Sequence, residues 1–149
     1  MTALTNLVPH TSIARFLTEV VRFAPGFVQA TGLLPANHPL VALGRAPAFL
    51  GIELGAQAAA ALETLGRASI ETKGAPRIGY LVGVRHAVFL RPDLPTDTPL
   101  DVTAKLLGAA APLAIYHVQV SIAGVECLHA SLSTHSAPDP QSFHELRRK

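Results

Sequence analysis

Residues 46–62 read APAFLGIELGAQAAAAL, and this alanine-rich stretch decides the fold. Apolar residues recur in it at steps of three and four and continue to Leu65, which is the spacing of one buried face of a helix. The pattern predicts a helix over residues 48–65, about 27 Å long at 1.5 Å per residue. Pro47 suits the first turn of this helix, and Gly66 suits its C-terminal end.

Strands are predicted on both sides of the helix. Residues 14–30 are rich in Phe, Val and Leu and break at Pro25-Gly26, which indicates a strand, a turn and a second strand. Four more strands are predicted after the helix, over residues 78–90, 100–107, 113–122 and 125–135. The last two alternate apolar and polar residues on either side of Ala123-Gly124, as a hairpin with one buried face does.

The order of these elements predicts the fold class. Two strands, one long helix and four strands give an α+β domain, in which an antiparallel sheet of about five to six strands wraps the helix. We expect one domain over residues 1–137 and a polar C-terminal tail over residues 138–149. One helix covers only part of such a sheet, so we expect strand pairing between subunits and at least a dimer.

Composition excludes several functional classes. The chain has 149 residues, 49% of them apolar, which suffices for one domain with a core. The formal charge of +2 is too small to indicate nucleic-acid binding, and residues 46–62 are too short an apolar run to span a bilayer. A single cysteine, Cys127, excludes an intrachain disulfide. Residues 1–16 lack a signal-peptide pattern, so we expect a cytoplasmic protein.

Glu53 is the first candidate for chemistry, because it is the one ionisable residue between positions 46 and 62. Burial disfavours the charged form of a carboxyl, as a general acid near neutral pH requires, whereas a helix N-terminus favours that form. The sequence leaves open which effect prevails. Gln57 follows one turn later on the same face, where it can hydrogen-bond Glu53 or orient a ligand. The alternative is that Glu53 faces solvent at the edge of the helix.

The segment Pro47-Ala48-Phe49-Leu50-Gly51-Ile52-Glu53-Leu54-Gly55-Ala56-Gln57 resembles the central-helix motif of the 3-hydroxyacyl-acyl carrier protein dehydratases. Residues 7–10, Leu-Val-Pro-His, and residues 79–97 are similar to the regions of that family before and after the helix. The resemblance covers roughly residues 7–135 and is closest to the dehydratase-like subgroup of aryl polyene biosynthesis clusters. It implies a hot-dog fold.

This resemblance also implies a mechanism. In the family a histidine removes a proton from C2 of the acyl thioester, and the helix acid assists loss of the 3-hydroxyl as water. The two residues come from different subunits of a dimer. Carried over, Glu53 is the acid, and the backbone amides of Ala48 and Phe49 polarise the thioester carbonyl. The resemblance implies no cofactor and no metal, an acyl thioester on acyl carrier protein or CoA, and a homodimer or a heterodimer with another hot-dog subunit.

The histidine is where the sequence departs from the family. The family has it fourteen positions before the acid, and here that position is Pro39, with His38 directly before it. A shift of one residue in the loop would restore the histidine. The similar subgroup often lacks it, which leaves His10 as a second candidate. The alternative for both His38 and His10 is an ordinary solvent-facing loop histidine.

The other histidines give weaker signals. His117, His129 and His135 fall on the polar face of the final hairpin, where a metal site is conceivable, but their serine and glutamine neighbours favour a solvated surface. We therefore predict no metal site.

Three functions remain open from the sequence. The first is dehydration of 3-hydroxyacyl thioesters to enoyl thioesters, which would make the chain a lyase of fatty acid or polyketide biosynthesis. The second is a hot-dog thioesterase in which Glu53 activates water. The third is a catalytically silent hot-dog subunit that binds acyl chains or supports an active partner, an interpretation that the missing histidine favours.

Overall fold

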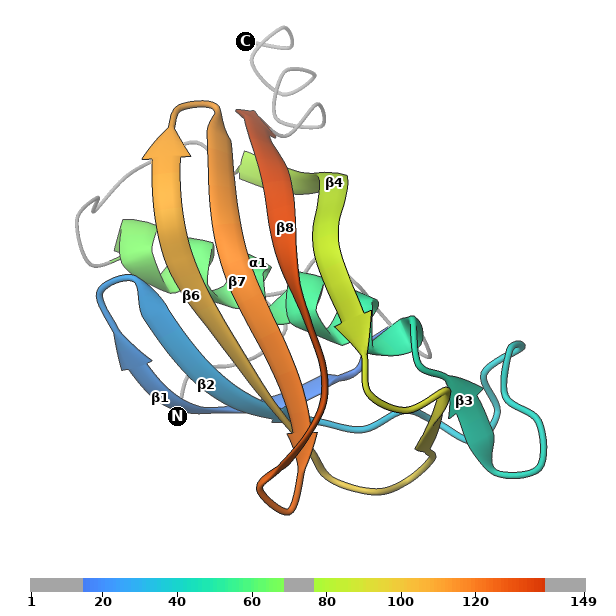
Figure 1. Cartoon of the computed structure of the whole chain (residues 1–149). Helices are drawn as coiled ribbons and strands as arrows, with labels where there is room; N and C mark the ends of the chain where they lie inside the picture. Colours follow the sequence, from blue (N-terminus) through green and yellow to red (C-terminus); the bar gives the residue numbers. More distant parts are fainter. Residues whose placement is uncertain (1–14, 69–76, 139–149) are drawn as a thin grey trace, which may run out of the picture.

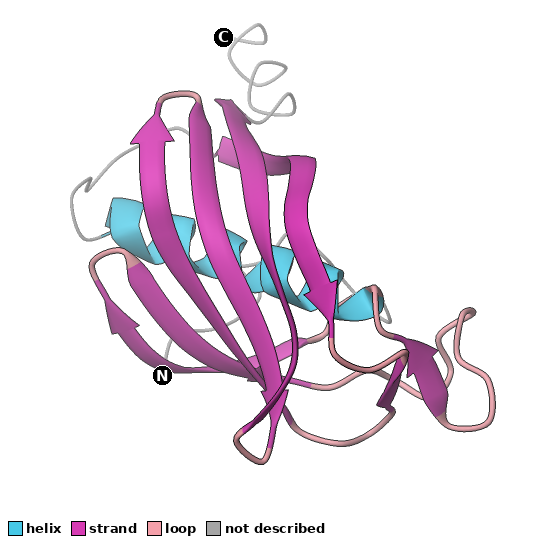
Figure 2. Cartoon of the chain, in the orientation of Figure 1, coloured by secondary structure: helices cyan, strands magenta, loops and turns pink. Residues whose placement is uncertain are grey.

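The computed structural model describes residues 15–68 and 77–138. One helix, α1 (Leu50–Ala68), packs against a six-stranded antiparallel sheet with the order β1-β2-β6-β7-β8-β4 (Figure 1). Figure 2 shows these as two layers, with α1 lying across the back of the strands. The arrangement confirms the predicted α+β class, with six strands in the main sheet.

The strands of the main sheet lie close to the predicted ranges. Their bounds are β1 (Leu17–Ala24), β2 (Phe27–Gly32), β4 (Arg77–Phe89), β6 (Leu100–Ala110), β7 (Leu113–Ile122) and β8 (Val125–Pro138). The turn between β7 and β8 has positive φ at both central residues, Ala123 and Gly124, as the predicted two-residue hairpin requires. The predicted tail after residue 138 lies outside the described residues.

A second, two-stranded sheet was not predicted. β3 (Arg45–Pro47) pairs with β5 (Asp93–Pro95) in antiparallel register. This pairing corrects the predicted start of the helix, because Pro47 ends β3 and α1 begins three residues later, at Leu50. The amide of Ala48 donates to the carbonyl oxygen of Pro92 (3.1 Å), which holds the chain in a turn before the helix.

The predicted end of the helix at Gly66 was also wrong, since α1 continues to Ala68. A glycine inside a helix costs only about 1 kcal/mol relative to alanine, which neighbouring interactions can offset. Here Arg67 lies 3.7 Å from Glu63, an ion pair one turn apart, and its positive charge suits the C-terminal end of the helix dipole.

Two helix glycines let the sheet approach α1 closely. A Cβ atom on Gly55 would lie 2.7 Å from Cγ2 of Val118 on β7, and one on Gly51 would clash with the side chain of Leu128 on β8. These positions are one turn apart and mark the side of the helix that faces the sheet. The close packing requires glycine at both.

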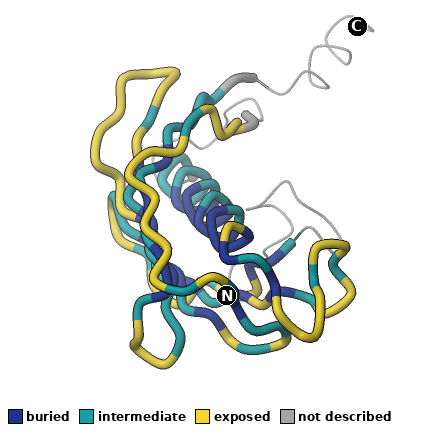
Figure 3. Tube along the Cα trace, turned by 45° about the vertical axis from the view of Figure 1, so that its right-hand side comes forward, coloured by how far each residue is buried: buried dark blue, intermediate teal, exposed yellow. Residues whose placement is uncertain are grey.

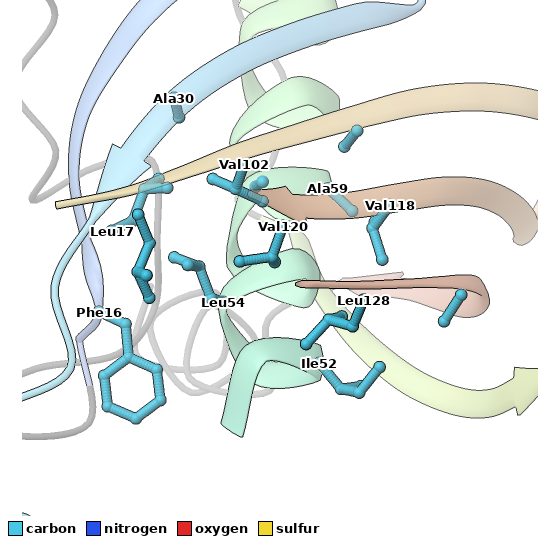
Figure 4. Close-up of a cluster of buried hydrophobic side chains, with 14 of the residues drawn as sticks. Phe16, Leu17, Ala30, Ile52, Leu54, Ala59, Val102, Val118, Val120 and Leu128 are labelled. Atoms are coloured by element: carbon cyan, nitrogen blue, oxygen red, sulfur yellow. The ribbon is translucent and has the colours of Figure 1, made fainter. Parts of the chain in front are cut away.

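The core fills the space between this side of α1 and the sheet (Figure 4). It is built from fully buried residues of the helix and of the central strands, among them Leu54, Val102, Val118, Val120 and Leu128. The buried turns of α1 lie inside the curve of the sheet, whereas the hairpin tips are exposed (Figure 3). No helix in the described residues is long and apolar enough to cross a membrane.

The edge strand β4 exposes many apolar side chains to solvent. It pairs with β8 on one side and has no other strand beside it in the described sheet. Six of its large apolar side chains are exposed: Tyr80, Leu81, Val82, Val84, Val88 and Phe89. Exposed apolar edges of this length are typical of strands that pair with a second chain.

Candidate active site

Glu53 lies in the first turn of α1 and is half-buried. It stands two residues from both Gly51 and Gly55, a rotation of about 200° at 3.6 residues per turn. Since the two glycines face the sheet, the Glu53 side chain projects from the opposite side of the helix. It is therefore not part of the core between helix and sheet.

Gln57 holds Glu53 in place. The carboxamide oxygen of Gln57 accepts hydrogen bonds from the backbone amides of Phe16 (2.9 Å) and Leu17 (3.0 Å). An N–H group can only donate, so these two bonds identify the oxygen and direct the Gln57 nitrogen elsewhere. That nitrogen donates to Oε1 of Glu53 at 3.3 Å.

This geometry gives the expected hydrogen bond between Gln57 and Glu53. Gln57 has no exposed surface, and its oxygen accepts hydrogen bonds from Phe16, just before β1, and from Leu17, the first residue of β1. Through these hydrogen bonds Gln57 connects β1 and α1 and contacts the Glu53 carboxylate. Direct contact of Gln57 with a substrate remains a prediction.

His38 lies in the loop between β2 and β3 and is half-buried. Its Nδ1 atom accepts a hydrogen bond from the amide of Leu40 (3.1 Å), so the neutral ring carries its proton on Nε2. The ring also contacts the edge of the Phe16 ring, with 5.7 Å between centroids. No hydrogen bond joins His38 to Glu53 in the described chain, and the two are connected through Phe16 and Gln57.

His10 lies outside the described residues, as does the whole motif of residues 7–10. The structure therefore places only one of the two predicted histidines, and the choice between them remains a prediction.

The two predicted amide donors differ in their contacts. The amide of Ala48 is engaged by Pro92, so a thioester carbonyl would have to compete for it. The amide of Phe49 makes no hydrogen bond to the described residues, and the residue is 53% exposed. Phe49 directly precedes α1, where the helix dipole favours a developing negative charge. The geometry thus favours Phe49 over Ala48 as the donor.

The histidines of the final hairpin form a different arrangement. Nδ1 of His129 lies 2.7 Å from a carboxylate oxygen of Glu126, and the rings of His129 and His117 are 5.7 Å apart. The described residues contain no group of three or more potential metal ligands. Glu126 was not predicted as a partner, because it lies next to the turn and outside the alternating polar face.

The backbone donors that fix Gln57 were also missed. The amides of Phe16 and Leu17 belong to two apolar residues, one just before β1 and one at its start, so no residue type signals them. The only usable signal was a glutamine in an alanine-rich helix, because a buried carboxamide needs hydrogen-bond partners.

Comparison with known proteins assigns the chain to a family and identifies structures with a similar fold. Residues 2–145 match the model of the ApeP-like family, described as ApeP dehydratase. The dehydratase heterocomplex ApeI:P from Xenorhabdus doucetiae is similar in structure, with a TM-score of 0.82, 20% identity, and coverage of 100% of this chain and 99% of that chain. No curated protein sequence matches.

Thioesterases are more distant structural neighbours. A hypothetical thioesterase with coenzyme A from Streptococcus pneumoniae has a TM-score of 0.59 and 16% identity, covering 81% of this chain and 86% of that one. The thioesterase HI1161 from Haemophilus influenzae has a TM-score of 0.55 and 15% identity, covering 80% and 78%. All three structures share the hot-dog architecture of one helix against an antiparallel sheet.

Proposed function

This chain belongs to the ApeP-like dehydratase family, and on that premise we propose that it dehydrates 3-hydroxyacyl thioesters with Glu53 as the acid. The predicted resemblance to hot-dog dehydratases is thereby confirmed, while the substrate and the site residues are our proposal. The single observation that carries it is the Glu53 carboxyl, which is directed away from the sheet and held by Gln57.

The proposed reaction is a β-elimination. A base takes the proton from C2, and the electrons of that C–H bond form the C2–C3 double bond as the C3–O bond breaks. Glu53 in its protonated form gives its proton to the departing hydroxyl, which leaves as water. The amide of Phe49 stabilises the negative charge that develops on the thioester oxygen.

The base is the second half of the proposed site, and the hydrogen bonds of His38 bear on its identity. A neutral His38 whose Nδ1 accepts from Leu40 has its Nε2 already protonated. It would have to exchange tautomers, and lose the bond to Leu40, before Nε2 could take a proton from C2. This geometry favours His10 or a histidine of a second subunit as the base.

We also propose that the working form contains a second hot-dog subunit. The exposed apolar edge of β4 supports association, and the similar ApeI:P structure is named as a heterocomplex. A heterodimer would also supply a base from outside this chain, which fits the missing family histidine. Homodimerisation is the alternative. The location that we propose is the cytoplasm, in keeping with the single cysteine.

The test is dehydration of 3-hydroxyacyl thioesters, on acyl carrier protein and on CoA, by the purified chain alone and mixed with a candidate partner subunit. Glu53→Gln should abolish formation of the enoyl thioester, with a loss of about a hundredfold or more, as expected for a general acid. Glu19→Gln is the matched control, because Glu19 is exposed on β1 and lies outside the helix motif, and it should retain full activity.

Two other outcomes would change the assignment. Release of free thiol that depends on Glu53 would identify a thioesterase, the function of the more distant structural neighbours. Formation of enoyl thioester at equal rates by wild type and Glu53→Gln, when the partner is present, would show a silent supporting subunit.

A further inference from the structure

A cavity of about 530 Å³ opens at the C-terminal end of α1. Its walls come from the last two turns of the helix, the outer part of the β6–β7 hairpin and the end of β8. Figure 1 shows α1 running behind these strands, with the β6–β7 hairpin reaching above the level of the helix. The residues that matter here are Leu62, Glu63, Arg67, Leu113, Tyr116 and Thr134.

This cavity is separate from the candidate active site. Arg67 follows Glu53 by fourteen residues along one straight helix, which corresponds to about 21 Å at 1.5 Å per residue. Neither Glu53 nor Gln57 lines the cavity.

Two buried polar atoms of the cavity have no hydrogen-bond partner in the described chain. They are Nη1 of Arg67 and the hydroxyl oxygen of Thr134, a residue that is only 9% exposed. The carboxylate of Glu63 lies 3.7 Å from Nη1 of Arg67, close enough for charge attraction but too far for a hydrogen bond. Buried donors nearly always have acceptors, so two unsatisfied groups in one cavity indicate a site for a polar ligand group.

Tyr116 adds a third donor to the same wall. Burial, and next the negative charge of Glu63, raise the pKa of Tyr116 to about 12, although Arg67 acts in the opposite direction. The phenol is therefore protonated at neutral pH. The cavity thus presents three donor groups against one carboxylate, which is already paired with Arg67.

The rest of the wall is apolar. It includes Leu62 of the helix, Leu106 and Leu113 of the hairpin, and several alanines. A pocket of this size, with a few polar groups at one place and apolar walls elsewhere, suits an amphiphilic small molecule.

We propose that this cavity binds an unesterified monocarboxylic acid with an apolar chain. Its carboxylate accepts hydrogen bonds from Arg67 and Thr134, and its chain lies against Leu62 and Leu113. A carboxylate fits better than a neutral group because it supplies acceptors for all the unsatisfied donors and a charge opposite to the guanidinium. The site would distinguish free acids from thioesters, whose carboxyl group carries no charge.

Isothermal titration of the purified full-length chain with octanoate tests the proposal, with octan-1-ol as the uncharged ligand of similar size. We expect octanoate to bind and octan-1-ol to bind at least about tenfold more weakly, since the alcohol lacks the charge-assisted hydrogen bonds. Arg67→Gln should weaken octanoate binding by about ten- to a hundredfold, and Thr134→Val by about three- to tenfold.

Two controls locate the ligand. Lys105→Gln removes a positive charge at an exposed position on β6 and should leave binding unchanged. Glu53→Gln should also leave it unchanged, and a loss there would place the acid in the active site and overturn the proposal. Because Glu53 and Arg67 are tested separately, failure of this site is distinguishable from failure of the proposed dehydratase.

A measurement on the wild-type protein covers the case in which a variant does not fold. Bound carboxylate next to the phenol should delay the ionisation of Tyr116 to still higher pH in a spectrophotometric titration with saturating octanoate. An unchanged tyrosine titration would overturn the proposal, as would equal affinities for octanoate and octan-1-ol or equal binding by Arg67→Gln and Lys105→Gln.

Discussion

Two substitutions of Gln57 test its two roles separately. Its carboxamide oxygen accepts from backbone amides, and its nitrogen donates to Glu53. Gln57→Met keeps an unbranched side chain with nearly the same helix propensity, but it removes the acceptor of the Phe16 and Leu17 amides. Each buried donor left unsatisfied costs about 1–3 kcal/mol, so the variant should lose about 2–6 kcal/mol of unfolding free energy. Gln119→Met on the outer face of β7 is the matched control, and it should change stability by less than about 0.5 kcal/mol.

Gln57→Glu tests the other task. Its carboxylate can still accept from both backbone amides, but in place of the donated hydrogen bond it sets a second negative charge against Glu53. The variant should be close to wild type at about pH 4, where carboxyl groups hold protons, and should lose stability as the pH rises toward about 7.

Urea unfolding of the four proteins at one protomer concentration, at several pH values, measures both effects. The reasoning is refuted if Gln57→Met loses less than about 1 kcal/mol. It is equally refuted if the stability of Gln57→Glu relative to wild type does not depend on pH.

Three further predictions follow from packing and burial. Stability should fall between about pH 10 and pH 12, because folded Tyr116 holds a proton that the unfolded chain releases, and Tyr116→Phe should remove this part of the pH dependence of urea unfolding. Gly55→Ala should destabilise the protein by about 1–3 kcal/mol through its clash with Val118, whereas Gly66→Ala, with open space around it, should stabilise it by up to about 1 kcal/mol in thermal unfolding. Val82→Lys, on the exposed edge of β4, should weaken subunit association in sedimentation analysis at unchanged circular dichroism, and undiminished association would rule out this edge.

The fold was predictable where periodicity is strong. The alanine-rich helix and the β7–β8 hairpin carry clear patterns of three to four and of two residues, and both were found. β3 and β5 were missed because each has three residues and a proline, too short for any period to be read. Their pairing then displaced the predicted start of the helix, so a tertiary contact decided a boundary that local signals had placed elsewhere.

The candidate site was predictable only where a residue type is unusual in its setting. Glu53 and Gln57 stand out in an apolar helix, and their spacing of four gives their contact. The amides of Phe16 and Leu17 carry no such signal, since every residue but proline has one. A sequence can indicate that a buried carboxamide needs partners, but not which strand brings them.

The cavity at the C-terminal end of α1 could not be predicted from the sequence. Arg67, Tyr116 and Thr134 come from three separate elements, and each alone is typical of a helix end or a strand. Their convergence depends on how α1 lies across β7 and β8. That tertiary arrangement leaves no local pattern in the sequence.

Gly51 and Gly55 of α1 also limit the positions to which an acidic residue can be moved along this helix. A shift of two residues turns a side chain by about 200° and would drive the carboxyl toward Val118 or Leu128, whereas a shift of seven residues restores the direction and advances it by about 10.5 Å. Ala60 occupies that equivalent position and is half-buried. Relocating the carboxyl from position 53 to position 60 would therefore keep the direction of the side chain and change its position along the helix axis. Steps of two helical turns thus offer a way to engineer chain-length selectivity.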